Sequence, residues 1–98
     1  GQDVALVFAA GPAHPNPFHT AARIGFSLPL RGRVAIRVHA PDGRLVRTLV
    51  NQVMDAGPHA VDWDGRDDVG AEVPSGMYFY RLTGDAGQAS TGRVLRVR

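Results

Sequence analysis

The chain has 98 residues, of which 44% are hydrophobic and 20% charged, the composition of one small globular domain. It contains no cysteine, which excludes disulfides, thiolate metal sites and a cysteine nucleophile. Its eleven basic residues are all arginine, but nine acidic residues reduce the net charge to +2, which argues against nucleic acid as a partner. The longest uncharged apolar run, residues 4–10, is far shorter than the roughly 20 residues of a membrane-spanning helix, so no membrane span is expected.

Alternating hydrophobic residues and regular turn signals predict seven short strands and no helix. The first expected strand is residues 4–10, and the proline-rich segment 11–17 after it is expected to be a stiff linker. On this basis we divide the chain into an N-terminal strand and linker, residues 1–14, and a sandwich, residues 15–98. The other expected strands are 22–28, 33–40, 45–50, 59–64, 76–83 and 91–98.

The turns between these strands carry glycines. Gly43 follows Pro41 and Asp42, which predicts a tight hairpin between the third and fourth strands. Gly43, Gly65 and Gly76 are expected to hold conformations that other residues do not adopt cheaply.

Seven strands without cysteine predict an all-β fold, an immunoglobulin- or fibronectin-III-like antiparallel β-sandwich with no disulfide. The alternation within each strand assigns the hydrophobic side chains to an inner face. The expected centre of the core is Phe26, Ile36, Val38, Val61, Trp63, Tyr78 and Leu82.

Two groups of apolar residues are candidates for a partner interface. Residues 4–8 are apolar on both faces of the expected first strand, with Val4, Leu6, Val7 and Phe8 as its large side chains. In the sixth strand, Arg81 marks the outer face, which also places Met77 and Phe79 outside. The favoured interpretation is that a loop or the N-terminal segment covers Met77 and Phe79. The alternative is a partner surface, because an exposed apolar patch of this kind is unusual in a monomer.

The acidic segment after the fifth strand is a weak candidate for a calcium site. Asp62, Asp64, Asp67 and Asp68 are oxygen ligands of the type that calcium uses, but they lack the spacing of a helix-flanked calcium loop. The alternative, that they cap turns through their own backbone, is favoured.

Catalysis is not expected. The four histidines are scattered without the spacing of a zinc site, and none of the serines lies in a nucleophile-elbow motif. Phosphate-loop and dinucleotide motifs do not occur, so we predict no enzyme activity and no cofactor.

Six blocks of residues, taken in order, resemble a known family, the immunoglobulin-like domain named after the flagellar hook-capping protein. A similar pattern is found in the C-terminal sorting domain (type A) of proteins exported by type IX secretion. The blocks are Pro15-Asn16-Pro17-Phe18, Ile24-Gly25-Phe26-Ser27-Leu28-Pro29, Asp42-Gly43-Arg44-Leu45-Val46-Arg47-Thr48-Leu49, Gly57-Pro58-His59, Trp63-Asp64-Gly65-Arg66-Asp67 with Gly70, and Ser75-Gly76-Met77-Tyr78-Phe79-Tyr80-Arg81-Leu82. The resemblance covers residues 15–98, and residues 92–98 are similar to the family's short basic tail.

The resemblance implies a non-catalytic module of an extracellular or cell-surface protein that serves export, anchoring or assembly. Its partners would be proteins: secretion machinery, the parent protein or copies of itself.

An alternative follows from the first strand. If residues 4–10 paired with a neighbouring sandwich, the chain would form a homo-polymer, an extracellular filament or lattice built by strand donation.

Overall fold

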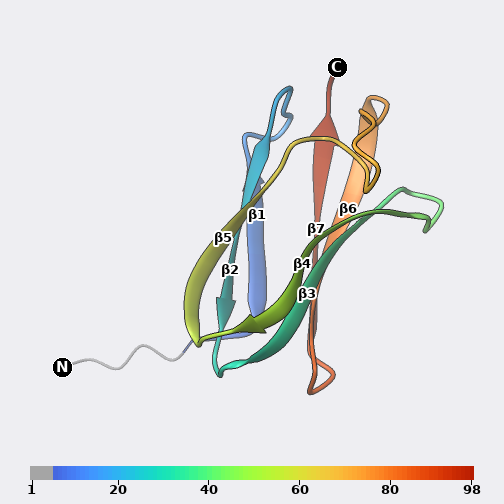
Figure 1. Cartoon of the computed structure of the whole chain (residues 1–98). Coiled ribbons are helices and arrows are strands. Elements are labelled where there is room, and N and C mark those ends of the chain that lie inside the picture. The colour runs from blue at the N-terminus through green and yellow to red at the C-terminus, as the bar shows by residue number, and fades with distance from the viewer. Residues whose placement is uncertain (1–5) are drawn as a thin grey trace.

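The computed structural model describes residues 6–98, which form seven β-strands in two antiparallel sheets packed face to face (Figure 1). This confirms the predicted immunoglobulin-like sandwich. The strands are β1 (Ala9–His14), β2 (Ala22–Leu28), β3 (Gly32–His39), β4 (Leu45–Met54), β5 (Gly57–Trp63), β6 (Gly76–Gly84) and β7 (Ala89–Arg96).

One sheet has three strands in the order β1-β2-β5, and the other has four in the order β4-β3-β6-β7. The chain passes from the four-stranded sheet to the three-stranded one in the short connection between β4 and β5. Within the described residues, no helix is long and apolar enough to cross a membrane.

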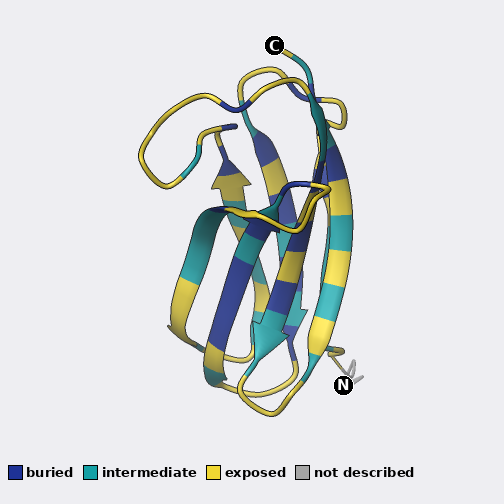
Figure 2. Cartoon of the chain, turned by 90° about the vertical axis from the view of Figure 1, so that its right-hand side faces the viewer, coloured by how far each residue is buried: buried dark blue, intermediate teal, exposed yellow. Residues whose placement is uncertain are grey.

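The period of two residues in the sequence explains why one face of each strand is buried. Along β2, Ala22, Ile24, Phe26 and Leu28 are buried, while the residues between them are exposed or half-buried. Figure 2 shows this alternation as bands of colour along the strands. Each sheet therefore presents one apolar face to the other sheet and one face to solvent.

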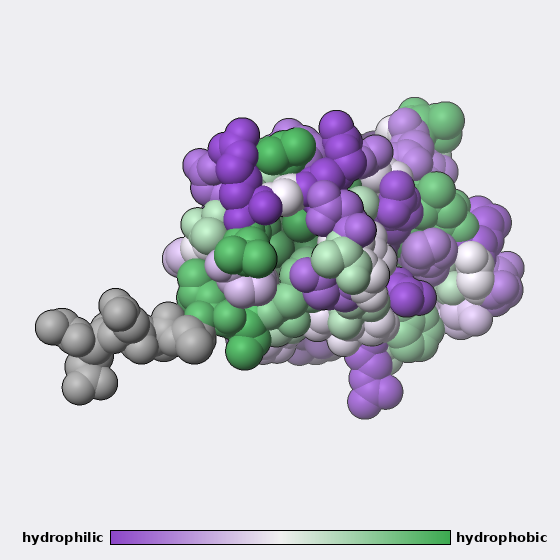
Figure 3. Space-filling view, turned by 90° about the horizontal axis from the view of Figure 1, so that it is seen from below, coloured by the Kyte–Doolittle hydropathy of each residue, from purple (hydrophilic) through white to green (hydrophobic). Residues whose placement is uncertain are grey.

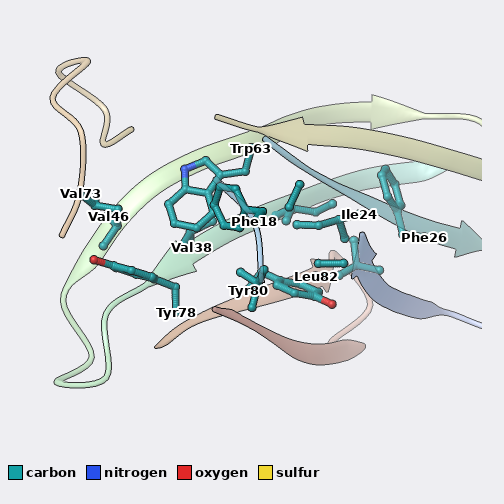
Figure 4. Packing of buried hydrophobic residues seen from close by; sticks show 14 of the residues in the cluster. Phe18, Ile24, Phe26, Val38, Val46, Trp63, Val73, Tyr78, Tyr80 and Leu82 are labelled. Atoms are coloured by element: carbon teal, nitrogen blue, oxygen red, sulfur yellow. The ribbon is translucent and has the colours of Figure 1, made fainter. Parts of the chain in front are cut away.

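The core lies between the two sheets, and its largest member is Trp63 at the end of β5 (Figure 4). The Trp63 ring lies 5.3 Å from Phe18 and 5.3 Å, edge-on, from Tyr78 of the opposite sheet. Its indole nitrogen donates a 2.9 Å hydrogen bond to the carbonyl oxygen of Arg66, so the one polar atom of the ring has a partner.

Six of the residues expected at the centre are buried in this core, and Val61 packs against its margin. The buried ones are Phe26, Ile36, Val38, Trp63, Tyr78 and Leu82. Phe18 and Tyr80, which are among the largest fully buried side chains, join them.

The first strand lies further along the chain than we predicted. β1 is Ala9–His14; of the expected strand 4–10, residues 4 and 5 lie outside the described residues and residues 6–8 are not in a strand. Part of the segment expected to be a linker therefore pairs with β2. The register shifts between Ala10 and Ala13, which places Pro12 in the irregular part of an edge strand. A proline is tolerated there because a bulge on an edge strand does not need its missing N–H.

Residues 10–18 cover the outer edge of β7. Phe18 donates to Leu95 at 3.0 Å and accepts from Val97 at 2.9 Å through its backbone. The side chain of Asn16 accepts from the Leu95 N–H at 2.9 Å, and the Ala10 N–H donates to the Ser90 hydroxyl at 3.0 Å. This edge is therefore occupied by the chain itself, which protects it from pairing with another chain.

Gly43 allows the hairpin between β3 and β4. Its φ is 90°, and its N–H donates to the Ala40 carbonyl at 2.9 Å. The Asp42 carboxylate accepts from the Arg44 N–H at 3.0 Å, which closes the turn.

Candidate functional site

Of the six residues predicted as a partner interface, the five that the structure describes do not form one surface. Val4 lies outside the described residues. Leu6 and Val7 are 38% and 66% exposed, whereas Phe8 is half-buried and packs against the core close to Gly84. Met77 and Phe79 lie in the half of β6 that is away from Gly84, on the outer face of the four-stranded sheet.

The surface near Phe8 mixes hydrophobic and polar residues. Figure 3 views the molecule from this end and shows hydrophobic residues (green) interspersed with hydrophilic ones (purple). The backbone here is held by the Ser27 hydroxyl, which donates a 2.5 Å hydrogen bond to the carbonyl oxygen of Val7. Residues 7 and 8 are thus bound to their own sandwich.

Phe79 stands at the centre of a cationic patch on the outer face of the four-stranded sheet. It is 37% exposed and lies directly opposite His39 of β3 on one side and Arg93 of β7 on the other. Arg81 follows two residues later on the same face, directly opposite Arg37. We call the patch formed by Arg37, His39, Phe79, Arg81 and Arg93 the arginine face.

The arginines of this patch form no salt bridge with an acidic side chain of the described residues, 6–98. Among residues 6–98, no carboxylate oxygen lies within 4.0 Å of Arg37, Arg81 or Arg93. The four strands of this sheet carry six arginines and neither aspartate nor glutamate. The acidic residues of the described chain lie instead in turns and loops and on β5.

The outer face of the three-stranded sheet has a different character. Arg23 of β2 lies opposite Asp62 of β5 and binds it at 3.0 Å, which raises the pKa of the Arg23 guanidinium. Beside this pair is a shallow apolar depression of about 500 Å³. Its lining includes the small residues Ala9, Gly11, Gly25, Ser27 and Ala60.

The four aspartates considered as calcium ligands each have partners within the protein. Asp62 binds Arg23, and Asp64 binds Arg47 at 3.2 Å. Asp67 accepts from two backbone N–H groups of its own loop, and Asp68 accepts from the Thr48 N–H at 3.0 Å. No three of the described histidine and acidic side chains are grouped in a way that could hold a metal ion. This arrangement is that of a loop held in place by its own carboxylates.

Arg96 is a buried residue that the sequence reasoning assigned only to the basic tail. It is 3% exposed, and its Nη2 lies 3.5 Å from the Glu72 carboxylate, while Nη1 donates to the carbonyl oxygen of His19. Its Cζ lies 5.5 Å from the centre of the Phe18 ring. The alternation of β7 could have revealed it, because Arg96 shares the inward face with Val94.

Gly65 makes room for Arg96. It has a φ of 73°, and a Cβ at this position would lie 2.5 Å from Nε of Arg96. Both its conformation and the space around it therefore require glycine. Arg96 thus joins the end of β7 to the loop after β5 through Glu72, and to the segment between β1 and β2 through Phe18.

Residues 20–88 match the model of a family described as the FlgD Ig-like domain. The chain belongs to this family. A curated relative from Salmonella typhimurium, the basal-body rod modification protein FlgD, is 38% identical over 55 residues, which are 56% of this chain and 24% of the relative.

Solved structures share the fold. PorU from Porphyromonas gingivalis, described as dimeric and latent, superposes with a TM-score of 0.73 at 22% identity over 87% of this chain and 9% of its own. FlgD from Xanthomonas campestris, described as essential for flagellar assembly through hook capping, superposes with a TM-score of 0.62 at 22% identity. That match covers 92% of this chain and 63% of the structure. The chain thus spans about a quarter of the curated relative it matches, 24% of its length.

Proposed function

We propose that this chain is a non-catalytic protein-binding module that serves the export, anchoring or assembly of an extracellular or cell-surface protein. The observation that carries the proposal is the match of residues 20–88 to the FlgD Ig-like domain family. The relatives named above are a flagellar assembly protein and a protein from Porphyromonas gingivalis of which a small part, 9% of its chain, has the same fold.

The surface of the sandwich supports a binding role. Residues 10–18 occupy the edge of β7, and the loop at Asp68 bonds to the edge of β4 at Val46 and Thr48. With these positions on the two edges of the four-stranded sheet in use, its outer face remains as a large surface for a partner.

The alternative function, a filament formed by donation of residues 4–10 to a neighbouring sandwich, is less well supported. Ala9 and Ala10 pair with β2 of their own chain as the start of β1, and the Ser27 hydroxyl donates a 2.5 Å hydrogen bond to the Val7 carbonyl. Donating residues 4–10 to a neighbour would break these contacts.

A reporter experiment tests the proposed function. The chain is fused to the C-terminus of a reporter that carries an export leader, and the fusion is produced in the bacterium from which the chain comes. We expect the fused reporter to be cut by protease added to intact cells or to be found in the medium. The reporter with the leader alone, and the fusion carrying Trp63→Ala, are the controls that should remain protected. Equal protection of the intact fusion and the leader-only reporter would overturn the proposal.

A further inference from the structure

The arginine face is assembled from like charges that the fold itself does not need. Arg37 and Arg81 are cross-strand neighbours on the same face, a placement that destabilises a sheet because like charges repel at this distance. Arg93 adds a third positive charge next to Phe79 on β7. Within residues 6–98, the acidic side chains that could offset these charges pair with other arginines or cap turns.

The positions of these residues define a shape as well as a charge. Phe79 is the exposed apolar centre. Arg93 lies beside it on the neighbouring strand β7, and Arg81 lies two residues further along β6. The row beyond Phe79 is apolar, since Met77 lies opposite Leu95. Strand geometry places such neighbours about 5–7 Å apart, which is the spacing of side chains on a facing protein surface.

We infer that the arginine face binds an acidic segment of a partner protein, with carboxylates contacting Arg37, Arg81 and Arg93 and an apolar side chain packed on Phe79. Arginine and aromatic residues are enriched at the centres of protein interfaces, and guanidinium groups bind carboxylates in a two-pronged geometry. The inference rests on the proposed function, because it names the chemistry of the partner that the module would bind.

A nucleic acid fits this surface less well than an acidic protein. Affinity for nucleic acid rises with the number of phosphates neutralised, and single strands need several aromatic rings for stacking. The arginine face offers three arginines and the single ring of Phe79 on a chain of net charge +2.

A peptide-binding measurement tests this inference. The probe is a fluorescein-labelled peptide, Glu-Glu-Leu-Glu-Glu-Leu-Glu-Glu, titrated with the whole chain at low salt and followed by fluorescence anisotropy. We expect binding that weakens as salt is added, and that Arg81→Glu weakens roughly tenfold or more. Arg31→Glu, which makes the same change of charge in the β2–β3 turn, is the matched control and should bind as the unaltered chain does.

The apolar centre has its own control pair. Phe79→Ser should weaken the binding of the peptide, whereas Leu30→Ser, at a side chain that is 76% exposed in the β2–β3 turn, should not. Thermal melting of each variant verifies that it is folded. Because Arg81→Glu places a carboxylate opposite Arg37, this variant is expected to fold at least as stably as the parent.

Several results would overturn the inference. These are equal weakening by Arg81→Glu and Arg31→Glu, equal binding of the peptide with glutamine in place of glutamate, or tighter binding of a single-stranded oligonucleotide of the same charge. Failure of the peptide to bind, together with a reporter that still reaches the cell surface, would show that the arginine face is not the binding site. The proposed function would still hold.

Discussion

In the three-stranded sheet, Arg23 on β2 stands opposite Asp62 on β5 and binds it at 3.0 Å, whereas in the four-stranded sheet Arg37 on β3 stands opposite Arg81 on β6. Both pairs are cross-strand neighbours on an outer face. The first pair supports strand pairing and the second opposes it.

The difference between the two sheets separates stability from recognition. Their inner faces share one core, in which Trp63 of the smaller sheet packs edge-on against Tyr78 of the larger at 5.3 Å. The outer face of the three-stranded sheet balances its charges, and the outer face of the four-stranded sheet does not. An uncompensated surface of this kind is typical of a site where function outweighs local stability.

The largest expected effect is on the core that both sheets share. Replacing Trp63 with alanine should lower the free energy of unfolding by about 3–5 kcal/mol, because a large buried ring is removed and its cavity does not fully close. Chemical denaturation of Trp63→Ala measures the loss. Val69→Ala, at a side chain that is 88% exposed, is the control and should leave the stability nearly unchanged. A Trp63→Ala variant as stable as this control would show that the sheets do not depend on a common core.

A smaller effect is expected where the four-stranded sheet bonds directly to β1. Tyr80→Phe removes the hydroxyl that donates to the Gly11 carbonyl at 2.7 Å. We expect a loss of about 1–2 kcal/mol, since the half-buried Gly11 carbonyl loses its partner. Hydrogen exchange should show faster opening of β1 and little change in β3. An equal increase of the exchange rate in β1 and in β3 would contradict this role of Tyr80.

Alkaline pH should weaken the same contact. Burial raises the pKa of Tyr80 and of Tyr78 above the usual value of about 10, because the phenolate is poorly solvated there. A raised pKa in the folded state means that the stabilisation is complete below the unfolded pKa and is lost as the pH rises through the folded one. Denaturation midpoints should therefore fall above about pH 10. The fall should be smaller for Tyr80→Phe, and parallel pH profiles for the two proteins would refute the assignment.

The smallest effects compare the outer faces themselves. Arg81→Glu should raise the stability by a few tenths of a kcal/mol, roughly, because it converts a repulsive cross-strand pair into an attractive one. Asp62→Arg should lower the melting temperature, because it places a second arginine opposite Arg23. In paired thermal melts at low salt, the melting temperature should rise for Arg81→Glu and fall for Asp62→Arg. A shift of the melting temperature in the same direction for both variants would contradict the difference between the two outer faces.

The strands from β2 onwards could be located from the sequence within a few residues, because alternation with period two is a local property that the structure preserves. The first strand could not. Its bounds depend on pairing with β2, and the apolar run at residues 4–10 favoured the wrong segment. The turn contacts of Asp67 in the acidic loop could also be predicted from the local sequence, since Asp67 accepts its hydrogen bonds from residues close to it in the chain.

The amino-acid sequence by itself therefore determined the strands from β2 onwards, their inner faces, the turn at Gly43 and the family. Only the tertiary structure decided which charges meet. Arg37 and Arg81 are far apart in the chain and become neighbours because β3 pairs with β6, and Arg96 is buried because the loop at Glu72 and the segment at Phe18 close over it. Alternation along a strand states which way a side chain points, but its neighbours across the sheet depend on strand order, which is set by packing of the whole core.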